Sequence, residues 1–84
     1  MQRINHAGLP EGHDVCIQLG ERIRELRKKR GWRQIDLAEQ AGIHEVHISD
    51  LERGAREVGL RHLAALAAAF DLSLSEFLEG VNGR

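Results

Sequence analysis

The stretch that determines the fold spans residues 31–54 and reads GWRQIDLAEQAGIHEVHISDLERG. Its first half carries a short apolar set at helical spacing, namely Ile35, Leu37, Ala38 and Ala41. This set stops at Gly42, and a second, shorter set stops at Gly54. The pattern predicts two short helices, at about residues 34–41 and 45–53, joined by a tight turn.

Three positions should fix how these two helices pack. We expect Ala38 to lie where their axes cross, because a larger side chain would push the axes apart. Leu37 and Ile48 are expected to fill the wedge between the helices. The residues at the two N-cap positions, Arg33 and His44, are weak caps, because Ser, Thr, Asp and Asn are preferred there.

The chain before this stretch predicts one longer helix. Apolar residues recur there at steps of four, four and three, at Val15, Leu19, Ile23 and Leu26. With Asp14 as its N-cap and Gly31 as its stop, this helix covers about residues 15–30. Residues 1–13 show no periodicity, and we expect them to form a mobile arm ahead of a domain of residues 14–84.

Two more helices are predicted after the stretch. The first is rich in alanine and is traced by Leu60, Leu63, Ala64, Ala67 and Phe70. The second begins at a capping box formed by Ser73 and Glu76, and its apolar residues are Leu74, Phe77, Leu78 and Val81. Two Phe, one Trp and no Tyr leave few of the aromatic residues typical of strands. The sequence therefore predicts an all-α, compact five-helix domain whose second and third helices form a helix-turn-helix.

Length and composition restrict the class of protein. Eighty-four residues suit one small domain. No run approaches the ~18 apolar residues of a membrane span, and the N-terminal residues contain no apolar segment of signal-peptide length. The lone Cys16 excludes an internal disulfide and is expected to be a small, half-buried hydrophobic residue. We therefore expect a cytoplasmic domain with no membrane association.

Charge is distributed unevenly along the chain. The net charge is −1, from 12 Lys and Arg against 13 Asp and Glu, which excludes a bulk polycation. Residues 21–33 carry seven cations and two anions, net +5, whereas residues 34–84 carry four cations and nine anions, net −5. Any binding to a polyanion must therefore be local. The alternative explanation of the basic run is a solvated helix face.

The central stretch resembles the DNA-binding domain of the phage-repressor and Cro family of helix-turn-helix regulators. The residues that carry the resemblance are Gly31-Trp32-Arg33-Gln34-Ile35-Asp36-Leu37-Ala38-Glu39-Gln40-Ala41-Gly42-Ile43 and Ile48-Ser49-Asp50-Leu51-Glu52-Arg53-Gly54. The resemblance covers about residues 20–79, and the loop at Val58 and Gly59 is similar to that of controller proteins of restriction-modification systems. It implies a sequence-specific transcription regulator whose partner is a double-stranded DNA operator.

The resemblance also implies a role for individual residues. The helix of residues 45–53 would lie in the major groove. Its side chains at the base edges would be His44, Glu45, Val46, Ser49 and Asp50, with His47 beside them. Phosphate contacts would come from Arg30, Arg33, Gln34, Arg53 and Arg56. Gln34 would also buttress the recognition helix, and Arg27 with Glu52 would form the family's buried ion pair.

The chain departs from the family pattern in the recognition helix. Glu45 and Asp50 stand where neutral or basic residues are usual, so two carboxylates oppose the phosphate field. A carboxylate can nevertheless read cytosine by accepting from its N4 amino group. Arg33 replaces the usual Ser or Thr and, with Arg30, could grip a phosphate beside Gln34. The acidic helix also favours an alternative, a protein-interaction or antitoxin-like module with weak or no DNA binding.

A dimer is expected because one such module covers only about 600–1,000 Å² of DNA. The expected seam consists of Leu74, Leu78 and Val81, and the alternative is that all three pack inward on the fourth helix. His44 and His47 are spaced i,i+3 but lack a third ligand, so we expect no metal, no cofactor and no enzyme activity. Trp32 is expected to be a packing lid over the turn between the first two helices.

Overall fold

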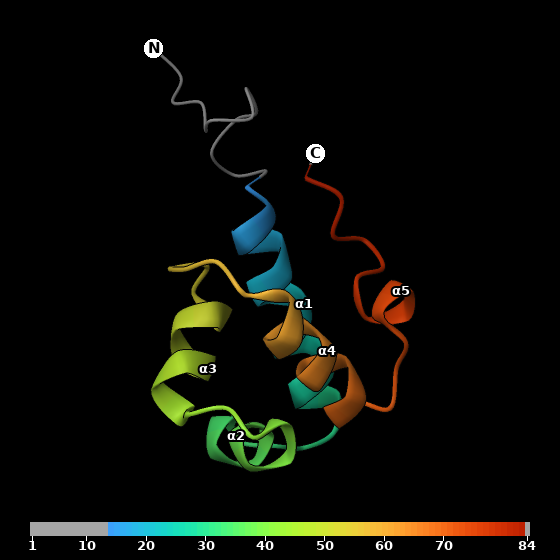
Figure 1. Cartoon of the computed structure of the whole chain (residues 1–84). Coiled ribbons are helices and arrows are strands. Elements are labelled where there is room, and N and C mark those ends of the chain that lie inside the picture. The colour runs from blue at the N-terminus through green and yellow to red at the C-terminus, as the bar shows by residue number, and fades with distance from the viewer. Residues whose placement is uncertain (1–13, 84) are drawn as a thin grey trace.

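Five helices form in the part of the chain that the computed structural model describes, residues 14–83 (Figure 1). They are α1 (Val15–Lys29), α2 (Gln34–Ala41), α3 (Glu45–Glu52), α4 (Leu60–Ala69) and α5 (Leu74–Phe77). No strand occurs within residues 14–83, and the all-α prediction is confirmed. The mobile arm predicted for residues 1–13 lies outside the described residues.

The helices pack around α1. It contacts α3, while α2 contacts both α3 and α4, and α4 contacts α5. In Figure 1, α3 and α5 lie on opposite sides of α1, with α2 beyond its C-terminal end. Among the described helices, none has the length and apolar character that a bilayer span requires.

Side-chain caps explain where two of the helices begin. The Asp14 carboxylate accepts a hydrogen bond from the Cys16 backbone N–H at 2.8 Å, which caps α1 as predicted. At α5 the Ser73 hydroxyl accepts from the Glu76 N–H at 3.1 Å, and the Glu76 carboxylate accepts from the Ser73 N–H at 2.8 Å. The predicted capping box is confirmed, and the hydrogen bond from the Ser73 backbone lowers the pKa of Glu76.

Arg33 makes no side-chain cap hydrogen bond at α2, as expected of a weak cap, whereas the expectation of weak capping by His44 at α3 was wrong. His44 Nδ1 accepts from the Val46 N–H at 3.2 Å, so an imidazole nitrogen takes the role of a Ser or Asp oxygen at α3. At α2 the cap is reversed, because the Asp36 carboxylate accepts from the Arg33 N–H at 2.8 Å. Between them Gly42 has φ +68°, a left-handed conformation that favours glycine and makes the tight turn possible.

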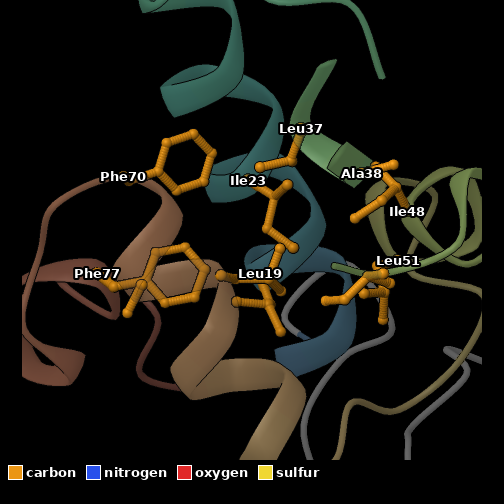
Figure 2. Close-up of a cluster of buried hydrophobic side chains, with 11 residues drawn as sticks. Leu19, Ile23, Leu37, Ala38, Ile48, Leu51, Phe70 and Phe77 are labelled. Atoms are coloured by element: carbon orange, nitrogen blue, oxygen red, sulfur yellow. The ribbon is translucent and has the colours of Figure 1, made fainter. Parts of the chain in front are cut away.

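The core lies where the inner faces of α1, α2, α3 and α4 meet, and Phe77 of α5 closes it. Its fully buried side chains are Ile23, Leu37, Ile48, Leu51, Leu66, Phe70 and Phe77. Figure 2 shows Leu37, Ala38 and Ile48 side by side at the α2–α3 end of the cluster and the two Phe rings at the other end. Ala38 is buried, in agreement with its expected place at the helix crossing. The helix-turn-helix is therefore held by the domain's own core.

The contact between α1 and α3 depends on Gly20, a residue that the sequence analysis missed. A Cβ at this position would lie 2.5 Å from the Leu51 carbonyl oxygen and 2.6 Å from that of Glu52. Both atoms belong to the α3 backbone, so no side-chain movement could relieve the overlap. The signal was available, because a glycine inside a helical pattern costs stability and commonly marks close packing.

The fifth helix differs from the prediction. It ends at Phe77, so Leu78 and Val81 do not continue a helical stripe with Leu74. Gly80 takes φ +84°, and the Gln18 side-chain oxygen accepts from the Asn82 and Gly83 N–H groups at 3.0 and 2.9 Å. These bonds hold residues 82 and 83 beside α1.

Leu78 and Val81 instead line an apolar pocket of about 300 Å³ within their own domain. Its other lining residues are Val15, Cys16, Leu19, Glu57, Val58 and Leu63. Burial raises the pKa of the Cys16 thiol, which is half-buried as expected. Leu78 and Val81 therefore follow the inward-packing alternative, whereas Leu74 is exposed.

Candidate nucleic-acid interface

The second helix of the helix-turn-helix, α3, has an inner and an outer face. Ile48 and Leu51 are buried, whereas His44, Glu45 and Val46 at its N-terminal end are exposed. The Val46 side chain is 62% exposed, which is unusual for an apolar residue and suits contact with another molecule. The outer face thus presents an imidazole, a carboxylate and an isopropyl group at the N-terminus of the helix, the end that meets base edges in helix-turn-helix domains.

The C-terminal end of α3 is held by Glu52. The Arg27 guanidinium of α1 donates to both Glu52 carboxylate oxygens, at 2.6 and 3.0 Å, and also to the Trp32 carbonyl oxygen at 2.8 Å. Gln34 Nε2 of α2 donates to the same carboxylate at 3.2 Å. Three helices are therefore tied together at one carboxylate, and the predicted Arg27–Glu52 pair is present. Its hydrogen bond raises the pKa of Arg27.

The start of α2 presents a second ion pair. Arg33 is 77% exposed, and its guanidinium lies 2.9 Å from the Asp36 carboxylate. This hydrogen-bonded pair lowers the pKa of Asp36 and raises that of Arg33. Arg33 therefore stands beside Gln34 at the open end of a helix, a location suited to a phosphate, but already has an acidic partner.

Arg30 does not join Arg33 at this location. Its guanidinium donates to the Phe70 carbonyl oxygen at the end of α4, at 2.6 Å, and lies over the Trp32 ring at 5.4 Å from the centroid. The Trp32 ring also stacks on Phe70, with centroids 5.7 Å apart. The expected grip of one phosphate by Arg30 and Arg33 therefore does not match this arrangement, because Arg30 satisfies an orphan carbonyl of α4.

Arg53 and Arg56 lie beyond the C-terminus of α3 and share Asp50. Arg53 Nη2 donates to one Asp50 oxygen, and Arg56 Nη1 lies 3.4 Å from the other. Arg53 Nη1 also donates to the Ser49 hydroxyl at 3.0 Å. The two expected phosphate contacts and two of the expected base-reading residues are thus brought together in one cluster.

His47 faces α4 rather than the outer face of α3, contrary to expectation. Its ring lies against His62 with centroids 4.8 Å apart, in an edge-to-face arrangement. Its Nε2 is buried and finds no hydrogen-bond partner among residues 14–83. Burial lowers the pKa of His47, and the nearby charges of Arg56 and His62 lower it further. Nothing in the sequence pattern points to His62, because periodicity does not link it to a residue on another helix.

The described residues hold no group of three or more side chains that could bind a metal ion. The spacing of His44 and His47 is accounted for by two separate roles. His44 caps α3, and His47 packs on α4.

The chain is similar to known helix-turn-helix proteins in sequence and in structure. The family model described as Helix-turn-helix matches residues 23–77. The HTH-type transcriptional regulator DdrOP3 of Deinococcus deserti is 43% identical over 65 residues, which cover 77% of this chain and 50% of that protein. This chain therefore spans about half the length of that relative.

Two solved structures share the architecture. The restriction-modification controller protein C.AhdI of Aeromonas hydrophila has a TM-score of 0.71 at 35% identity, with 74% of this chain and 94% of that chain covered. The clp gene regulator ClgR of Corynebacterium glutamicum has a TM-score of 0.74 at 30% identity, with 80% and 71% covered. The family model matches well over half of this chain and includes α2, the turn and α3. The chain belongs to the helix-turn-helix family.

Proposed function

We propose that this chain is a sequence-specific DNA-binding transcription regulator that acts as a dimer on operator DNA, with α3 in the major groove. The observation that carries the proposal is the exposed outer face of α3, whose other end is anchored by Arg27 and Gln34 through Glu52. A reading surface needs such anchoring, because base contacts depend on how accurately the helix is positioned.

The flanking charges support the same role. Arg33 precedes the exposed end of α2, and Arg53 with Arg56 follow α3, so guanidinium groups stand on both sides of the reading surface. Such groups position a protein on the backbone without carrying sequence information. The regulator and controller names of the relatives also favour binding rather than catalysis.

The dimer is proposed because one domain offers a small DNA footprint. Of the expected seam, Leu78 and Val81 are half-buried and line a pocket of their own domain, so we expect them to contribute less to it. Leu74 remains exposed at the start of α5 and is the member of the expected seam that a second copy could cover. Two half-sites would then lie about one helical turn apart or a multiple of it.

A second candidate is a protein-interaction module. The observation that favours it is that every arginine expected to touch phosphate already has a partner within residues 14–83. Exposed acidic residues such as Glu45 would then face a basic protein surface.

Selection of bound duplexes from a random-sequence library, followed by titration at several salt concentrations, separates the two functions. A DNA regulator should enrich a two-fold symmetric site, and log affinity should fall with log salt by about 0.9 per phosphate contact. Glu45→Gln should relax preference at one base pair by about 1–3 kcal/mol. No enrichment and no binding at low salt would favour the protein-interaction module.

A further inference from the structure

The charged side chains at the C-terminal end of α3 are paired with one another. Asp50 stands between Arg53 and Arg56, and each of its carboxylate oxygens serves a different guanidinium. Arg53 Nη1 also donates a hydrogen bond to the Ser49 hydroxyl at 3.0 Å. The Asp50 side chain is only 25% exposed, whereas those of Arg53 and Arg56 are 62% and 50% exposed.

In this arrangement, DNA binding would replace the Asp50 carboxylate by a phosphate as the anionic partner of Arg53 and Arg56. Each guanidinium keeps N–H groups that Asp50 does not occupy. One carboxylate nevertheless neutralises half of the combined charge of Arg53 and Arg56, so they attract a phosphate at full strength only when Asp50 moves away. A carboxylate that is released beside a polyanion, without a donor of its own, opposes binding. This repulsion weakens binding to every DNA sequence that does not provide such a donor.

We propose that Asp50 is a specificity-determining residue, whose carboxylate clamps Arg53 and Arg56 in the free protein and is released to a base edge only where the DNA offers a hydrogen-bond donor. The proposal rests on the function proposed above. A carboxylate can only accept, and the donor that acidic side chains use in the major groove is the N4 amino group of cytosine. Asp50 therefore weakens binding to most sequences more than binding to the operator.

Two other carboxylates serve to distinguish the pairing of Asp50 with Arg53 and Arg56, here called the clamp, from simple repulsion between a carboxylate and the DNA phosphates. Glu45 also lies on α3, but none of the ion pairs among residues 14–83 includes it, and Arg33 feels its charge only from a distance. Glu25 on α1 holds two cations, Arg22 at 3.1 Å and Lys29 at 3.7 Å. Arg22 reaches the carbonyl oxygens of α5, so this second cluster lies away from the reading surface. Glu25→Gln is therefore a matched control with the same change in charge.

The first test uses the full chain and a mixed-sequence duplex of about 30 base pairs, or three helical turns. Asp50→Asn should bind this duplex more tightly than wild type. Its affinity ratio between about 50 and 200 mM salt should rise by about three- to fourfold, the effect of one further phosphate contact. Glu25→Gln should leave both quantities unchanged. An Asp50→Asn protein without any gain would overturn the proposal.

The second test separates the clamp from repulsion by repeating Asp50→Asn in a chain that carries Arg53→Gln and Arg56→Gln. The clamp predicts that the gain disappears in this background, because no arginine remains to be released. A gain of undiminished size there, or one equal to that of Glu45→Gln in the wild-type background, would mean simple repulsion and overturn the proposal.

The third test concerns specificity and uses the site selected by the wild-type chain. Asp50→Asn should lower the ratio of affinities for this site and for the mixed-sequence duplex by about fivefold or more, as expected for one lost base contact. An unchanged ratio would overturn the release to a base edge. If wild type binds no duplex at about 50 mM salt, the proposed function fails and this inference with it. If wild type binds steeply and Asp50→Asn gains nothing, this inference alone fails.

Discussion

Arg27 and Glu52 form a bidentate pair that joins the first helix to the recognition helix, with N–O distances of 2.6 and 3.0 Å. Their side chains are only 12% and 4% exposed, so neither charge has water as an adequate substitute partner. Glu52 also accepts from Gln34, which makes its carboxylate the common acceptor for side chains of α1 and α2. The orientation of α3 therefore depends on one buried carboxylate.

Arg27→Ala should strongly destabilise the domain, because it leaves the Glu52 carboxylate buried without its cation. The expected loss is about 3–5 kcal/mol in the free energy of unfolding. Arg24→Ala, at an exposed position of the same helix, is the control and should change stability by no more than about 0.5 kcal/mol. Urea unfolding measures both. Equal, small losses would show that water solvates Glu52 adequately.

Gly20→Ala should separate α1 from α3. The added Cβ would lie 2.5 and 2.6 Å from two backbone carbonyl oxygens of α3, so the helices must move apart. We expect a loss of at least about 1–3 kcal/mol. Gly59→Ser is the control, because a Cβ there meets nothing within 4 Å and a serine would cap α4. Thermal unfolding should show a lower Tm for the first variant only.

Stability should fall on acidification because of His47. Burial lowers its pKa in the folded protein below the usual value of about 6.5, so well above that pH both states are neutral and His47 contributes no pH dependence. As pH falls through 6.5 toward the folded pKa, the unfolded state takes up a proton first, and stability is lost.

His47→Gln should remove this part of the pH dependence. The measurement is the difference in Tm between wild type and variant at about pH 7.5 and 5.5, on either side of the unfolded pKa. Asp36 and Glu76, whose pKa values are lowered, lose their contributions only at more acidic pH and do not confuse the comparison. A difference that does not change between the two pH values would contradict the burial of His47.

Leu74→Glu should weaken the proposed dimer without unfolding the domain. Leu74 is exposed, and an acidic residue in the first turn of a helix is favourable. Leu78→Glu is the contrasting variant and should lower the Tm, because Leu78 lines the pocket inside the domain. Sedimentation and thermal melts measure the two effects. A wild-type chain that stays monomeric at high micromolar concentration would contradict the dimer.

The sequence was sufficient for the helices that carry strong local signals. Asp14, Ser73 and Gly42 mark boundaries through their own backbone and capping chemistry, which needs no distant partner. The Arg27–Glu52 pair was also found, but through resemblance to a family rather than through spacing, because 25 residues separate its members.

The segment after α5 combines a local signal with distant contacts. Leu74, Leu78 and Val81 have helical spacing, yet α5 ends at Phe77. Gly80 then takes a left-handed φ of +84°, and Gln18 on α1 binds the backbone of Asn82 and Gly83. A local pattern contains no information about a hydrogen bond to a residue more than sixty positions away. Leu78 and Val81 therefore pack against their own domain, whereas Leu74 stays exposed.

The same division applies to the candidate interface. The sequence by itself determined the two short helices, the glycine turn and the residues near the recognition helix, since these follow from periodicity and backbone preference. Only the tertiary structure decided what each side chain does: Arg30 binds the end of α4, His47 packs on His62, and Asp50 holds Arg53 and Arg56. The physical reason is that a long polar side chain can bond to any of several groups that the fold brings within its reach. Spacing along the chain does not indicate which of these groups it will bond to.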